Sequence, residues 1–320
     1  MLRFLSLTLS TLIVIISSSA PAAQAAELVR LDHAVSAAVS DTARQQAILD
    51  SLRPAIDAMA KIGILESPDL HGMEQYAESR AFKFFEPEVK ARLDGAALTC
   101  SIDTTLLRLP AILPDINTPR HIYGIITPYN QAVMNVDSVM LVGLNHYLGK
   151  DFGAYSYFEP YIRRQKDSRL APYHVAESLV QQSYPMLADS TTTALSHMIR
   201  DGAVTAAVMA SVPEPSLADA GGWTAEELQW LKQHEKELLQ DIREKKIIES
   251  TDPKIISQLL APSPGTLMFE NHAPGRTGRY IGYRMVRSYL DSNPSATIAD
   301  LLMPSGYIDQ APTIAQNYAP

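Results

Sequence analysis

Two short segments in the middle of the chain carry side chains that could bind a metal ion or move a proton. The first contains His174 and Glu177, and the second contains His197 and Asp201. Residues three or four apart lie on one face of a helix, so each pair would present its side chains together. If the two predicted helices face each other, the four residues would form a site of two histidines and two carboxylates.

The first segment departs from the usual pattern of a zinc hydrolase. That pattern places two histidines four residues apart on a helix, with a glutamate after the first as general base. Val175 occupies the position of the base and Ser178 that of the second histidine. Valine cannot transfer a proton, and serine is a poor zinc ligand. We therefore expect no catalytic residue and no cofactor. The histidines and carboxylates are instead expected to hydrogen-bond to each other as polar pairs within the fold. A zinc-dependent hydrolase with an atypical His/carboxylate site is the alternative.

A second candidate site is a local concentration of aromatic and basic residues. It comprises Tyr147, Tyr157, Tyr161, Arg163 and Arg164. Tyrosine has an apolar ring and a polar hydroxyl, so such a group could line a groove for a peptide or a glycan. The other interpretation is a shell of tyrosines whose hydroxyls satisfy buried backbone groups.

Glycines and arginines alternate near the C-terminus, at Gly275, Arg276, Gly278, Arg279 and Gly282. This pattern could mark a helix start that binds an anion. Close packing of a helix at the glycines is the interpretation that we favour.

Composition excludes several classes of protein. The chain of 320 residues has a formal net charge of −8 and no basic stripe, which argues against a nucleic-acid partner. A hydrophobic content of 46% with 19% charged residues is typical of a globular chain. Cys100 is the only cysteine, so no intramolecular disulfide can form, and we expect its side chain to be buried.

The N-terminus has the pattern of a signal peptide. Arg3 precedes an apolar run from Phe4 to Ile16, and Ala23–Ala25 has the A-x-A form of a cleavage site. We predict a signal peptide over residues 1–25 and a single domain over 26–320. The protein is then expected in the periplasm or outside the cell. We expect no stable membrane anchor after cleavage. The expected partner of the protein is an envelope protein, a peptide or a glycan.

The remaining pattern predicts a mainly helical α+β fold with a small sheet. β-Branched runs at His121–Ile126 and Val136–Leu144 indicate two neighbouring strands, and prolines mark Leu106–Pro119 as loops. Trp223–Ile248 is predicted as one helix, with Thr224 and Glu227 spaced as a capping box. A helical stripe around Ile281–Leu290 ends before Pro294.

Several motifs resemble the gliding motility lipoprotein family known as GldB. They are NHYLGKD at 145–151, PYIRR at 160–164, APGRTGRYIGYRMVRSYL at 273–290 and ATIADLL at 296–302. These motifs occur in the expected order, and the resemblance covers roughly residues 121–302.

The resemblance implies a layout similar to zincin-like peptidases, which carry HExxH on one helix and Glu-Gly on a later one. It places His174 at the first histidine and Asp201-Gly202 at the later pair, with Val175 and Ser178 at a lost base and a lost ligand. This implies an exported zincin-like pseudoenzyme that acts as an accessory or binding protein of the cell envelope. Family members are typically lipid-anchored, whereas the cleavage junction predicted here has no cysteine.

Overall fold

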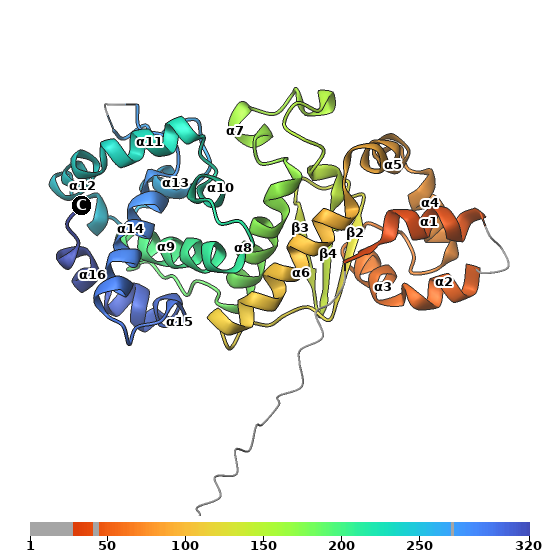
Figure 1. The fold of residues 1–320 in the computed structure, drawn as a ribbon, viewed down its shortest axis with the longest axis horizontal. Helices are drawn as coiled ribbons and strands as arrows, with labels where there is room; N and C mark the ends of the chain where they lie inside the picture. Colours follow the sequence, from red (N-terminus) through yellow and green to blue (C-terminus); the bar gives the residue numbers. More distant parts are fainter. Residues whose placement is uncertain (1–27, 41–44, 270–271) are drawn as a thin grey trace, which may run out of the picture.

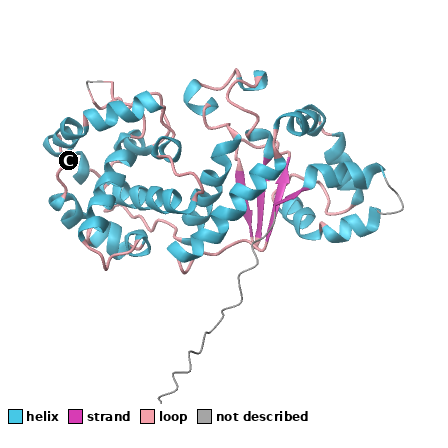
Figure 2. Ribbon diagram, viewed as in Figure 1, coloured by secondary structure: helices cyan, strands magenta, loops and turns pink. Residues whose placement is uncertain are grey.

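The computed structural model describes residues 28–40, 45–269 and 272–320. The predicted signal peptide at 1–25 lies outside them. The described chain is mainly helical with one small sheet (Figures 1 and 2), which confirms the predicted α+β class. The strands are β1 (Leu28–Arg30), β2 (His121–Ile125), β3 (Val133–Val136) and β4 (Val139–Gly143). The helices are α1 (Leu31–Ser40), α2 (Gln45–Ser51), α3 (Arg53–Lys61), α4 (Leu70–Glu78), α5 (Arg80–Arg92), α6 (Gly95–Ile112), α7 (Pro160–Arg163), α8 (Ala171–Ser183), α9 (Ala194–Ser211), α10 (Leu217–Gly221), α11 (Ala225–Gln233), α12 (Glu235–Glu244), α13 (Pro253–Leu260), α14 (Thr277–Ser292), α15 (Ile298–Leu302) and α16 (Ala311–Asn317). Short helical turns are η1 (Leu144–His146), η2 (Gly153–Tyr155), η3 (Ser168–Leu170), η4 (Ile247–Glu249) and η5 (Ser305–Asp309).

The sheet is mixed, with the strand order β1-β2-β4-β3. β1, β2 and β4 run parallel, and β3 pairs antiparallel with β4. The strand predicted at His121–Ile126 is confirmed. The strand predicted at Val136–Leu144 begins too early, because a tight turn at Asp137, with φ of 53°, separates Val136 in β3 from β4. Only two polar residues, Asp137 and Ser138, separate the two strands, so the sequence pattern resembles one continuous strand.

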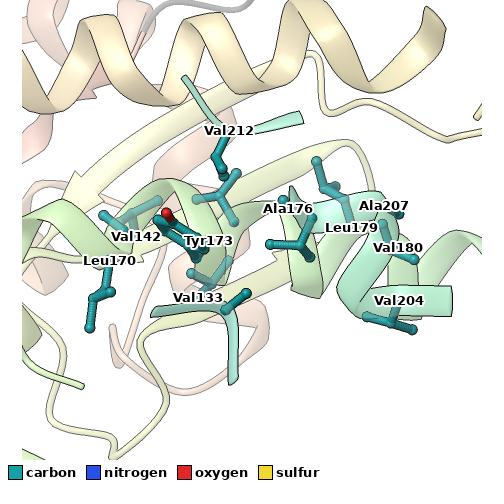
Figure 3. Close-up of a cluster of buried hydrophobic side chains, with 14 of the residues drawn as sticks. Val133, Val142, Leu170, Tyr173, Ala176, Leu179, Val180, Val204, Ala207 and Val212 are labelled. Atoms are coloured by element: carbon teal, nitrogen blue, oxygen red, sulfur yellow. The ribbon is translucent and has the colours of Figure 1, made fainter. Parts of the chain in front are cut away.

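Helices cover both faces of the sheet. In Figure 1, α1–α5 lie on one side and α6 and α8 on the other, with the later helices beyond α8. β3 contacts α8, and α3 contacts β2 and β4. Figure 3 shows apolar side chains from several elements meeting in this layer. Val133 and Val142 come from the sheet, Leu179 from α8, and Val204 from α9. The core therefore fixes α8 between the sheet and α9.

The loop prediction for Leu106–Pro119 is wrong in its first half, because α6 continues to Ile112 with Pro110 in its last turn. Its buried face includes Leu98, Ile102 and Leu109, which recur at helical spacing. Cys100 lies off this face and is exposed, contrary to the expected burial.

The predicted helix at Trp223–Ile248 is interrupted at His234, which ends α11 and precedes α12. The residue that follows, Glu235, is buried and accepts hydrogen bonds from Tyr280 and Arg284 on α14. Turning α12 toward α14 allows these contacts. The predicted capping box of Thr224 is confirmed, and α14 ends at Ser292, before Pro294, as expected.

α9 and α14 approach each other at two glycines. A methyl group built on Gly282 would lie 1.9 Å from the Met198 carbonyl oxygen of α9, and one on Gly202 would lie 2.4 Å from the Gly282 carbonyl carbon. Only hydrogen fits at such separations. Close helix packing is thus confirmed at Gly282, and it brings side chains of α9 and α14 together.

No helix in the described ranges combines the length and the apolar character needed to cross a membrane.

Candidate functional site

A cavity of about 400 Å³ lies where α8, α9 and α14 meet. It gathers three of the four residues predicted as a His/carboxylate site, which are Glu177, His197 and Asp201. It also contains three arginines that the prediction did not include. The polar lining consists of Glu177, Gln181, His197, Arg200, Asp201, Arg276 and Arg279, with Met186 and Leu260 as apolar neighbours. The site therefore has charges of both signs.

Arg279 lies between the two carboxylates. Its Nη1 donates a hydrogen bond of 2.8 Å to Glu177, and its Nε lies 3.8 Å from an oxygen of Asp201. The same Nε donates to the Thr205 hydroxyl at 2.9 Å. The Arg279 side chain is only 3% exposed, whereas Glu177 and Asp201 are 23% and 20% exposed. One buried guanidinium therefore holds both acids in place from α14.

The two carboxylates respond differently to this environment. Burial acts to raise the pKa of Glu177, but the charges of Arg279 and Arg276 outweigh it and hold that pKa below its usual value. Burial raises the pKa of Asp201 despite the same arginines. Within the described part of the chain, the Asp201 carboxylate accepts no hydrogen bond. Asp201 thus keeps acceptor capacity on the cavity wall.

His174 lies on α8 but has a different partner. Its Nδ1 shares a hydrogen bond of 3.0 Å with the hydroxyl of Tyr147. Burial lowers the pKa of His174 to about 4, so its imidazole is neutral near pH 7. His197 is half-buried on the cavity wall, and burial lowers its pKa as well. The structure brings His197 to the cavity and couples His174 to a core tyrosine.

The fit of these residues to a zinc ion is poor. Glu177 already bonds to Arg279. Val175 is fully buried in the core, and the Ser178 hydroxyl accepts a hydrogen bond of 2.8 Å from the Asn135 side chain of β3. Across residues 28–40, 45–269 and 272–320, no three His, Cys, Asp or Glu side chains are placed to hold a metal ion. A zinc site remains the alternative interpretation, without a ligand set among the described residues.

The five residues of the predicted groove occupy different environments. Tyr147 is buried in the core, whereas Tyr157 is 76% exposed. Tyr161 and Arg164 line a small cavity of about 20 Å³ beside Arg276, and Arg164 pairs with Glu227 at 3.0 Å. Arg163 is half-buried at the end of α7. A peptide or glycan groove along these side chains remains a prediction.

The sequence interpretation did not place any arginine beside the predicted His/carboxylate residues. Arg276 and Arg279 belong to the glycine-arginine pattern, which predicted an anion site at the start of the helix or close packing. Arg200 directly precedes Asp201 and is buried, with its guanidinium bonded to the Tyr184 carbonyl. An arginine next to a candidate carboxylate was the available signal. The sequence could not show that α14 would bring further arginines to the same carboxylates.

The chain matches the sequence model of a known protein family. The sequence model of the family described as gliding motility protein GldB matches residues 17–308. Searches among curated proteins and among solved structures found no match.

Proposed function

The chain belongs to the gliding motility protein GldB family, and we propose that it is an exported, periplasmic accessory protein that binds a ligand and does not cleave it. In this proposal the protein is a pseudoenzyme with a zincin-like fold, and the region that corresponds to the catalytic site of a peptidase is a binding cavity. The predicted signal peptide supports export.

The contact of Arg279 with Glu177 carries the proposal. A carboxylate that bonds to a buried guanidinium is held as an acceptor with a lowered pKa, so it is poorly suited to take up a proton as a general base near neutral pH. The same contact occupies an oxygen that a metal ion would need. The alternative, a hydrolase using His174, Glu177, His197 and Asp201, would require both acids to exchange Arg279 for a metal.

Metal analysis of the chain, purified without chelators, tests this proposal. We expect zinc and iron well below one ion per chain, and no cleavage of casein or of a peptide library. Near-stoichiometric zinc or iron that disappears in a His174→Ala/His197→Ala double variant would establish the hydrolase instead. The Asp291→Asn variant, altered at an exposed residue of α14, serves as the control for purification.

A further inference from the structure

The charges that line the cavity leave unused hydrogen-bonding capacity of both signs. Arg279 and Glu177 bond to each other at 2.8 Å, although the Nη2 of Arg279 has no partner among the described residues. Two guanidinium groups, those of Arg200 and Arg276, and one carboxylate, that of Asp201, then remain on the wall. These three charged groups could bond a ligand.

The two remaining arginines use few of their donors. A guanidinium has five N–H donors. Arg276 makes one hydrogen bond within the described residues, from Nη1 to the Gly221 carbonyl at 3.2 Å. Arg200 likewise makes one, to the Tyr184 carbonyl. The Nε atoms of both side chains have no partner in the described ranges. Buried donors without partners are costly, and an anionic ligand would supply acceptors.

The cavity wall also carries an acceptor that a cation could use. Asp201 lies in this lining with no hydrogen bond to its carboxylate among described residues, because Arg279 directs its Nε toward Thr205. A ligand with only negative charge would approach Asp201 and Glu177 unfavourably. A ligand with only positive charge would face three arginines. A ligand with separate charges of both signs could pair its negative group with an arginine and its positive group with Asp201.

We propose that this cavity binds a zwitterion of the amino-acid type, with its carboxylate on Arg276 and Arg200 and its ammonium on Asp201. A free amino acid and the end of a peptide share this chemistry, and a volume of about 400 Å³ suits a small ligand. The inference rests on the proposed binding function and specifies its ligand.

Calorimetric titration of the purified chain tests the inference with alanine, alanyl-alanine, N-acetyl-alanyl-alanine and alanyl-alanine amide. We expect alanine or alanyl-alanine to bind, and each blocked dipeptide to bind at least about tenfold more weakly than the unblocked one. Binding of alanine would indicate a free amino acid as ligand, and binding of the dipeptide alone would indicate a peptide end.

Two variants test which side chain binds each charged group of the ligand. Asp201→Asn should remove the discrimination against the acetylated dipeptide, and Arg276→Gln should remove the discrimination against the amide. Asp291→Asn, at an exposed acid on α14, should change neither. Melting temperatures of all variants show whether each is folded.

Two results would overturn the inference. One is a blocked dipeptide that binds as tightly as the free one, and the other is an absence of binding by all four probes. Neither result concerns metal content or cleavage. The titrations therefore test the class of ligand, and the metal and peptidase assays test the proposed non-catalytic function separately.

Discussion

Replacement of Arg279 by methionine should destabilise the protein in a way that depends on pH. The side chain is 3% exposed and contacts both Glu177 and Asp201. Methionine fills a similar volume and adapts its shape, so the main loss is the charge. Removing one partner of a buried ion pair costs about 3–5 kcal/mol. Because the two carboxylates are partly exposed, solvent screening reduces the expected loss to about 2–4 kcal/mol at pH 7.

The sign of the pH dependence follows from the pKa shifts. In the wild type, the lowered pKa of Glu177 gives stability that is present above its unfolded value of 4.5 and is lost as the pH falls. The raised pKa of Asp201 acts in the opposite direction, since its contribution is lost as the pH rises. Without Arg279, both pKa values rise. The free-energy penalty of the Arg279→Met variant should therefore shrink as the carboxylates become protonated at acidic pH.

Urea unfolding followed by tryptophan fluorescence measures this penalty. The Trp223 indole donates a hydrogen bond of 2.8 Å to Gly275, just before α14, so its emission reports on that region. Adding Glu177→Gln to Arg279→Met should recover at least about 1 kcal/mol. Arg287→Met is the matched control, because Arg287 is 46% exposed on the same helix, and it should change stability by less than about 0.5 kcal/mol. A loss below about 1 kcal/mol at pH 7, or an equal loss at acidic pH, would refute the reasoning.

Two further substitutions test the close packing of α9 against α14 and, elsewhere in the fold, a buried lysine. Gly282→Ala should cost at least about 2 kcal/mol in urea unfolding because its methyl group would contact the α9 backbone. Gly153→Ala has open space and should have little effect, and equal effects would contradict the close crossing. Lys166 is buried against the His146 ring at 2.9 Å, and burial lowers its pKa to about 8. Because the folded state releases this proton first, stability should rise by about 1–2 kcal/mol, relative to Lys166→Met, between about pH 7.5 and 9.5. A parallel pH profile in Lys166→Met would argue against the buried ammonium.

Local features of the fold could be predicted from the sequence. The capping box of Thr224 depends on two side chains three residues apart, and the strand from His121 depends on a short β-branched run. Both are decided by neighbouring residues. Errors arose where distant packing decides the structure. The helix break at His234 accompanies burial of Glu235 against α14. There Glu235 accepts a hydrogen bond from the Tyr280 hydroxyl, 45 residues away in the sequence.

The candidate site shows the same division between local and distant causes. Spacing alone indicated that His197 and Asp201 share a helix face, and both line the cavity. Spacing could not show which cation meets Glu177, because Arg279 lies 102 positions away. The same histidine and carboxylate pattern is compatible with a metal or with an arginine, and these imply different chemistry.

Whether a metal ion or an arginine lies beside the two carboxylates depends on how closely α9 and α14 cross. Gly202 follows Asp201 directly, and Gly282 lies three residues after Arg279, so the two glycines that allow the close approach are next to the charges it brings together. A side chain at either glycine would separate the helices and withdraw the guanidinium from the carboxylates. The Asp-Gly pair, which by resemblance could mark a metal ligand, therefore has a direct structural role here: it allows an arginine from α14 to occupy the space beside the acids.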